Sequence, residues 1–124
     1  MKADFALSPA RVSATAYVLE VGGELDLYTA PRLSSQVGEL IARGATHLIF
    51  DLTETTFIDS TALHVLLDAR KRVLEEGGDV VVVCPSPHVR RVFEVTGVDG
   101  LLRLCRSAEV AIEELPPEGG IHAA

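Results

Sequence analysis

The sequence predicts a single α/β domain, with a mixed sheet of four to five strands and about four helices packed on it. Short runs rich in Val, Ile and Leu alternate with longer amphipathic segments, which is typical of strands joined by helical crossovers. The chain has 124 residues, 48% of them hydrophobic, and this suits one hydrophobic core. We expect residues 1–115 to form the domain and residues 116–124 to form a mobile tail.

Three strands are predicted in the first half of the chain. Residues 5–7 form a short edge strand, and Ser8-Pro9 follows as a break. Residues 16–21 alternate as a half-buried strand does, and Gly22-Gly23 then allows a bulge or a bend. Residues 46–50 form a continuous apolar run, of the kind that is buried on both faces of a parallel sheet.

The first predicted helix begins near Pro31 and ends at Gly44. Proline is tolerated in a first helical turn, because the N–H group that it lacks would be unpaired there. Apolar residues then recur at the spacing of one helix face. The residues expected on this inner face are Leu33, Val37, Leu40 and Ile41.

The centre of the chain, residues 47–73, organises the rest. A loop is expected from Asp51 to Asp59, and a helix from Ser60 to about Glu76, where two glycines follow. The apolar residues of this helix fall on one side. They are Leu63, Leu66, Leu67, Val73 and Leu74.

Two further strand and helix pairs complete the pattern. Residues 79–84 are the clearest strand, because a run of valines suits the centre of a sheet. Ser86 should cap the next helix. A last strand covers 101–105, and Ser107 caps a final helix. The inner faces of these two helices are expected to carry Val89, Val92, Phe93 and Thr96, then Ala108, Ala111, Ile112 and Leu115.

The composition narrows the classes of partner. The formal net charge of −7 argues against nucleic acid, whose binding depends on Lys and Arg that neutralise phosphates. The same charge permits a basic protein partner. No signal peptide is visible at the N-terminus, and no apolar run approaches the length of a membrane span. We therefore expect a soluble cytoplasmic protein that binds neither nucleic acid nor membrane.

No metal or cofactor is expected. The four histidines, His47, His64, His88 and His122, have no ligand-like spacing with each other or with the cysteines. A receiver-type metal site on Asp51 and Asp59 would also need a lysine after the last strand, and none is present. Cys84 and Cys105 follow apolar runs and suit buried positions; a disulfide between them stays open.

The residues around Ser60 form the strongest candidate site. Asp26, Asp51 and Asp59 all follow predicted strands, and ligands collect at strand carboxyl ends in open α/β sheets. A helix start favours an anion, so a phosphate on Ser60 would add charge to a surface already holding carboxylates. Two plainer alternatives stay open: Ser60 caps the helix, or Asp59 caps it with Ser60 at the first helical position.

An enzyme is not expected. His64 lies one turn after Ser60, which invites a hydrolase interpretation. Residues at i and i+4 on one helix lie side by side, however, and no G-x-S-x-G elbow surrounds the serine. We interpret His64 as a surface histidine, because a catalytic triad requires a serine, a histidine and an acidic residue held in one specific arrangement.

Three segments resemble the STAS domain, and more narrowly a bacterial anti-sigma factor antagonist. They are residues 23–33 (GELDLYTAPRL), 48–52 (LIFDL) and 57–63 (FIDSTAL). The resemblance implies a STAS fold and a partner that is an anti-sigma factor serine kinase. The unphosphorylated antagonist binds this kinase and frees its sigma factor. Phosphorylation of Ser60, with Thr61 a less favoured acceptor, ends binding, and a serine phosphatase restores it.

The resemblance also implies a docking face. The family usually has Gly where Ala62 stands and often a small residue where His64 stands, so His64 should narrow the choice of partner. Asp51 would give acidic support. A non-switching STAS scaffold or transport-accessory subunit is the alternative function. The residues expected to bind the partner are Asp26, Tyr28, Thr29, Arg32, Asp59, Ser60, Thr61 and His64.

Overall fold

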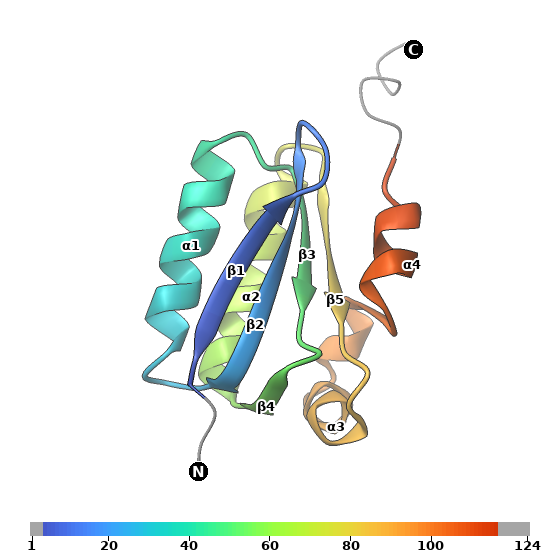
Figure 1. Ribbon diagram of the computed structural model, residues 1–124. Helices are drawn as coiled ribbons and strands as arrows, with labels where there is room; N and C mark the ends of the chain where they lie inside the picture. Colours follow the sequence, from blue (N-terminus) through green and yellow to red (C-terminus); the bar gives the residue numbers. More distant parts are fainter. Residues whose placement is uncertain (1–3, 117–124) are drawn as a thin grey trace.

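The computed structural model describes residues 4–116, and these build a mixed sheet between two layers of helices (Figure 1). The described strands are β1 (Ala6–Arg11), β2 (Ala16–Leu25), β3 (His47–Asp51), β4 (Thr55–Ile58), β5 (Asp79–Val83) and β6 (Arg103–Cys105). The described helices are α1 (Ala30–Ala42), α2 (Ser60–Leu74), α3 (Pro87–Thr96) and α4 (Ala108–Glu113), with a 3-10 turn, η1 (Val98–Gly100).

The strands lie in the order β1-β2-β3-β5-β6, and β4 pairs with β2 beyond the end of β3. The pair β1 and β2 is antiparallel, while the other pairs are parallel. The predicted α/β class and the mixed sheet are therefore confirmed. The sheet of the described residues has six strands, however, rather than the four to five expected.

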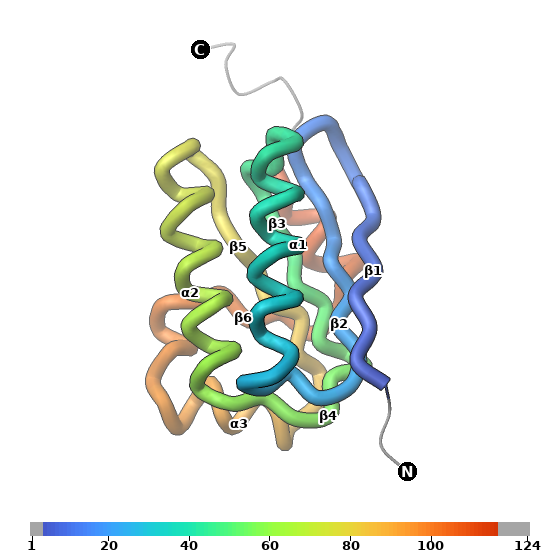
Figure 2. Tube along the Cα trace, turned by 90° about the vertical axis from the view of Figure 1, so that its left-hand side faces the viewer, coloured from blue at the N-terminus to red at the C-terminus, as the bar shows by residue number. Residues whose placement is uncertain are grey.

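Helices cover both faces of the sheet unequally. Helices α1 and α2 lie side by side over one face, which Figure 2 shows in front of the strands, and α4 lies on the other (Figure 1). Neighbouring residues of β3 serve the two faces, because side chains alternate along a strand. Phe50 belongs to the large core with α1 and α2, and Ile49 belongs to a smaller core with Ala111 of α4.

The sequence predicted that Ser8-Pro9 ends the first strand. This prediction is wrong, because both residues lie within β1. Among the strands of residues 4–116, this one pairs only with β2, where Pro9 stands opposite Leu19. Proline is tolerated on an edge strand, because one side of such a strand has no neighbour to accept an N–H group. On the outer side of β1, the N–H group that Pro9 lacks would have no strand partner, so no sheet hydrogen bond is lost there.

Strand β2 also runs beyond its predicted end. Gly22 and Gly23 lie within the strand, and its pairing shifts register between Gly23 and Glu24. Gly23 has φ 87°, and a Cβ atom there would lie 2.9 Å from the carbonyl oxygen of Asp4. The glycine is thus needed for both backbone conformation and space. The irregularity turns the end of β2 toward a new partner, β4.

The predicted loop between Asp51 and Asp59 contains that partner. Thr55 and Ile58 of β4 are buried, although the segment lacks a long apolar run. The Thr55 hydroxyl donates to the carbonyl oxygen of Val21 at 2.7 Å, which replaces the water that it loses. Strand β4 is therefore stabilised by its pairing with β2, a tertiary contact that hydrophobic periodicity does not reveal.

The helix starts agree with the predicted caps. The hydroxyl of Ser86 accepts from the Val89 amide at 3.5 Å, and that of Ser107 accepts from the Val110 amide at 3.2 Å. The predicted inner faces are wrong at one residue each in α2, α3 and α4, because these residues lie toward the helix ends, where the core no longer covers them. The exposed residues are Leu74, Thr96 and Ile112.

Residues 1–3 and 117–124 lie outside the described residues, and with them His122 and all of the predicted tail except Pro116. The domain limits of 1–115 stay a prediction. Within residues 4–116, none of the helices has both the length and the apolar character that crossing a bilayer requires.

Candidate functional site

The ends of β2 and β4 bring together two segments that are far apart in the sequence. The strands are parallel, with Leu25 opposite Ile58, so the residues that follow them lie side by side. The Asp59 amide donates to the Leu25 carbonyl oxygen at 3.2 Å and extends the pairing by one bond. The turn before α1 and the start of α2 thus meet at the lower end of the molecule in Figure 1.

Asp59 is the cap of α2, and Ser60 is the first helical residue. Asp59 has extended backbone, and its Oδ1 accepts from the Ala62 amide at 3.2 Å. Its Oδ2 accepts from the Leu27 amide at 3.0 Å. Of the two caps left open by the sequence, the structure has Asp59. Ser60 is exposed, and its hydroxyl has no hydrogen-bond partner within residues 4–116.

Asp26 folds the turn that precedes α1. Its Oδ1 accepts from the amides of Tyr28 at 2.9 Å and Thr29 at 3.1 Å. The Thr29 hydroxyl accepts from the Asp26 amide at 2.8 Å and donates to the Glu24 carbonyl oxygen at 2.9 Å. Asp26 and Thr29 therefore hold the loop shape, as Asx-type turns do, and leave the side chain of Tyr28 outside it.

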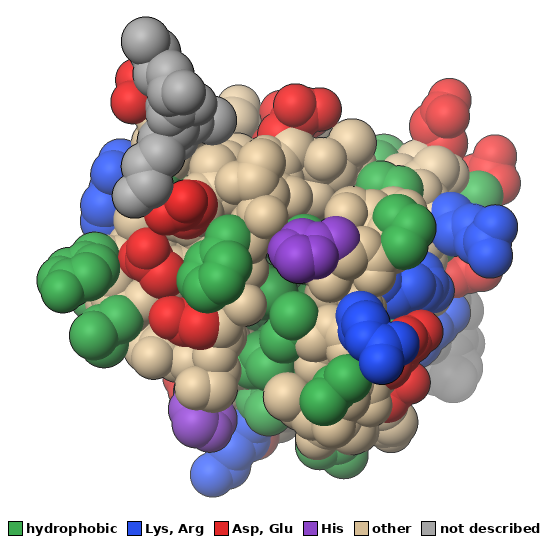
Figure 3. All heavy atoms as spheres, turned by 90° about the horizontal axis from the view of Figure 1, so that it is seen from below, with side chains coloured by type: hydrophobic (Ala, Val, Ile, Leu, Met, Phe, Trp, Pro, Cys, Tyr) green, Lys and Arg blue, Asp and Glu red, His purple; other side chains and the backbone are tan. Residues whose placement is uncertain are grey.

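Exposed hydrophobic side chains lie in the two segments that meet at the start of α2. Tyr28 is 83% exposed, Leu27 59% and Phe57 44%. Figure 3 shows hydrophobic side chains next to acidic ones on this end of the molecule. We call the surface formed by Leu27, Tyr28, Phe57, Ser60 and His64 the Ser60 face. Clustered exposed apolar groups of this kind are typical of interaction surfaces.

The sequence did not single out Leu27 and Phe57. Each is an apolar residue beside residues that the motif analysis did use, but only the pairing of β2 with β4 sets them on one surface. A single exposed apolar residue is common on protein surfaces, so the sequence carries little signal for either residue.

The other predicted docking residues lie around this face. His64 is exposed one turn after Ser60, while Thr61 is half-buried. The guanidinium of Arg32 lies 4.9 Å from the ring centre of Phe5, a cation–π contact with the segment before β1. The structure thus brings His64 and Thr61 next to Ser60 and directs Arg32 toward the N-terminal segment.

Asp51 is not part of the Ser60 face. Its Oδ1 accepts from the amide of Thr53 at 3.0 Å and from the hydroxyl of the same residue. It lines a hollow of about 360 Å³ with Glu20 and Glu54, on a different part of the surface. Among residues 4–116, no three His, Cys, Asp or Glu side chains lie together as a metal site would require.

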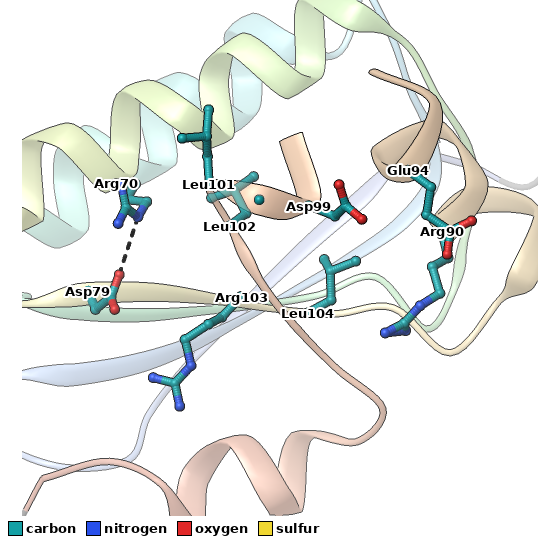
Figure 4. Close-up of a pocket in the computed structure, with 10 residues that line it drawn as sticks. Arg70, Asp79, Arg90, Glu94, Asp99, Leu101, Leu102, Arg103 and Leu104 are labelled. Carbon is teal, nitrogen blue, oxygen red and sulfur yellow. Dashed lines mark ion pairs between the residues drawn. The ribbon is translucent and has the colours of Figure 1, made fainter. Parts of the chain in front are cut away.

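A further hollow lies at the β6 edge of the sheet, with a volume of about 500 Å³ (Figure 4). Arg70 forms an ion pair of 3.5 Å with Asp79 across it. Arg90 donates to the Cys84 carbonyl oxygen at 3.3 Å, and Arg103 binds Glu114 at 3.0 Å. Arg70 is half-buried.

Both cysteines are free thiols on neighbouring strands. The Cys84 amide donates to the Cys105 carbonyl oxygen at 2.9 Å, so the two residues are adjacent without a disulfide. Cys84 is buried as expected, while Cys105 is half-buried. Burial raises the pKa of the Cys84 thiol, and the nearby Arg90 partly opposes this shift.

The chain is similar in sequence to known regulators. A family model described as STAS domain matches residues 8–111. The anti-sigma-B factor antagonist of Staphylococcus aureus is 29% identical over 94 residues, which cover 76% of this chain and 87% of that protein.

Solved structures agree with this likeness. The crystal structure of an anti-sigma factor antagonist from Mycobacterium paratuberculosis has a TM-score of 0.80 at 27% identity, and the match covers 89% of this chain and 92% of that one. SpoIIAA, an anti-sigma factor antagonist in its unphosphorylated form, has a TM-score of 0.76 at 24% identity, covering 87% and 94%. The phosphorylated form of SpoIIAA, a Bacillus cell fate determinant, has a TM-score of 0.70 at 22% identity, covering 90% and 100%.

Proposed function

Because this chain belongs to the STAS domain family, we propose that it acts as an anti-sigma factor antagonist that is switched by phosphorylation of Ser60. The unphosphorylated form binds an anti-sigma factor that is a serine kinase, and the sigma factor is released. The kinase phosphorylates Ser60, binding ends, and a serine phosphatase resets the protein. The switch acts in the cytoplasm, and the antagonist itself catalyses no reaction.

The exposed hydroxyl of Ser60 is the observation that carries this proposal. Ser60 is exposed at the first position of α2, and Asp59 already caps the helix. The hydroxyl is therefore not needed for folding. A kinase can reach it without unfolding the helix. Thr61 is half-buried and a poorer acceptor.

A phosphate at this position would add strong negative charge beside the exposed apolar side chains of the Ser60 face. Phosphoserine carries roughly −1.5 to −2 charges near neutral pH. The dipole of α2 favours an anion at the start of the helix, but Asp59 is the adjacent residue and its carboxylate repels the phosphate. A partner that buries Tyr28 and Leu27 would have to strip water from the new charge, and this opposes binding.

We assign two kinds of role to the docking residues. Tyr28, Ser60, Thr61 and His64 touch the partner, together with the newly found Leu27 and Phe57. Asp26, Thr29 and Asp59 fix the loop shape through the bonds described above. Arg32 contributes at the margin, beside Phe5. Asp51, which lies outside the face, adds only negative charge at longer range.

The proposal is tested by incubating the protein with its cognate kinase and ATP and then mapping phosphate by mass spectrometry. We expect one phosphopeptide, modified at Ser60. Ser60→Ala should abolish it, while the matched variant Thr61→Ala should leave it intact. A protein that binds its partner equally with and without phosphate would instead be a non-switching STAS scaffold or transport-accessory subunit.

A further inference from the structure

We infer that Asp59 is a positioning residue that links Ser60 to the Leu27–Tyr28 turn, and that phosphorylation of Ser60 releases this turn. The inference rests on the proposed function, because it describes how the phosphate acts on the docking surface. Asp59 stands between the acceptor serine and a segment 32 residues away in the sequence.

The two carboxylate oxygens of Asp59 bind different elements. Oδ1 accepts from the Ala62 amide at 3.2 Å, within the first turn of α2. Oδ2 accepts from the Leu27 amide at 3.0 Å, in the turn before α1. A carboxylate has enough acceptor capacity for both bonds at once, and both are strengthened by its charge.

The Leu27 amide has no other described support, although the rest of its turn is bonded internally. Tyr28 and Thr29 donate to the carboxylate of Asp26, and the Ala30 amide donates to the Asp26 carbonyl oxygen at 2.8 Å. Losing the Asp59 carboxylate bond would therefore leave the turn closed but without the bond that joins its Leu27 amide to the start of α2. Leu27 and Tyr28, which project from it, would lose their fixed position on the Ser60 face.

A phosphate on Ser60 acts directly on this carboxylate. Ser60 follows Asp59 immediately, so two anions would share the start of α2. Both compete for the same first-turn N–H groups, which have no carbonyl partner within the helix. Repulsion between the anions disfavours the arrangement in which Asp59 reaches both elements. The bond to Leu27 is the one that should be lost, because it reaches outside α2, whereas the bond to Ala62 lies within the first helical turn.

The test measures hydrogen exchange of the Leu27 amide by NMR in the full chain, with phosphoserine genetically encoded at position 60. This needs no kinase. We expect Leu27 to exchange about tenfold faster in the phosphorylated protein. The Ala30 amide is the internal control, and its exchange should not change, because its bond to Asp26 lies within the turn.

The variant Asp59→Asn supplies the second arm. An amide side chain has an NH2 donor in place of one carboxylate oxygen, so it cannot accept both bonds in the geometry of Asp59, where each oxygen binds a different N–H group. Leu27 should exchange faster without phosphate, and phosphate should add nothing further. Asp59→Ser, which still caps a helix, repeats the test if the first variant folds poorly. Asp51→Asn is the matched control and should behave as the unmodified protein does.

Leu27 exchange that stays within about twofold after phosphorylation would overturn the inference. The inference would also be overturned if phosphoserine made Leu27 exchange still faster in the Asp59→Asn variant, so that the two effects added. Both outcomes are distinct from failure of the proposed switch. If phosphate ends partner binding while Leu27 stays bonded, the switch acts by charge alone; if the kinase ignores Ser60, the switch fails whatever Leu27 does.

Discussion

The hydroxyl of Thr55 donates a 2.7 Å hydrogen bond to the carbonyl oxygen of Val21, joining β4 to β2 across 34 residues. Thr55 is 3% exposed, and it is the only polar residue among residues 4–116 that is buried. The bond holds together the two strands whose next residues are Asp26 and Asp59. The buried threonine thus helps to fix the position of the Ser60 face, together with the backbone pairing of the two strands.

Replacing Thr55 with valine should reduce the free energy of unfolding by about 1–2 kcal/mol, because the variant keeps the shape but loses a buried bond. Thr56→Val is the matched control, since Thr56 is exposed in the same strand. Its effect should stay within about 0.5 kcal/mol. Urea unfolding of both variants measures the difference, and equal stabilities would argue against a role for the bond.

Two glycines should respond in opposite ways to alanine. A Cβ atom on Gly78 would lie 1.5 Å from the Thr46 carbonyl oxygen, so the backbone must move. Gly78→Ala should cost about 3 kcal/mol or more. Gly38 lies in α1 with nothing within 4 Å of such an atom, and Gly38→Ala should stabilise by about 0.5–1 kcal/mol. Thermal unfolding of the pair checks both signs.

His47 should make the protein less stable in mild acid. Burial lowers the pKa of His47 from 6.5, and the Asp79 carboxylate partly opposes the shift. The folded state then binds a proton less readily than the unfolded state. Stability is therefore lost as the pH falls below 6.5 toward the folded pKa, and it is retained above 6.5.

His47→Gln should flatten the dependence of unfolding free energy on pH across this window. His64→Gln, which replaces an exposed histidine, is the matched variant for comparison. Denaturant titrations at a series of pH values provide the measurement. An unchanged slope in the His47 variant would assign the pH dependence to other groups.

The two thiols should react at different rates. Cys84 is buried with a raised pKa, so little thiolate is present and reagents reach it only when the structure opens. Cys105 is half-buried and should be modified first by a thiol reagent at pH 8. Single variants Cys84→Ser and Cys105→Ser identify the fast phase. Faster reaction of Cys84 would mean that this end of β5 opens readily.

Local sequence patterns correctly predicted several helices and strands. The inner face of α1, the valine run of β5 and the serine caps of α3 and α4 are local patterns, and each is found where expected. The one-residue errors at Leu74, Thr96 and Ile112 fall near helix ends, where packing partners decide exposure.

The site was predictable in part. The sequence indicated Asp26, Asp59 and Ser60 as residues after strands, and parallel pairing of β2 with β4 brings them to one end. Strand β4 itself has only four residues and no strong pattern, so the exposed Leu27 and Phe57 could not be placed together. The choice between Asp59 and Ser60 as cap also depends on a distant amide, that of Leu27.

Binding of the anti-sigma factor kinase, measured by calorimetry, tests the central claim most directly. We expect Ser60→Ala to bind within about threefold of the unmodified protein, because the hydroxyl has no structural role. Phosphoserine at position 60, or Ser60→Asp, should weaken binding by at least about 100-fold, which corresponds to roughly 2.7 kcal/mol. If Ser60→Asp and the phosphorylated protein bind the kinase as tightly as Ser60→Ala does, Ser60 is not the switch.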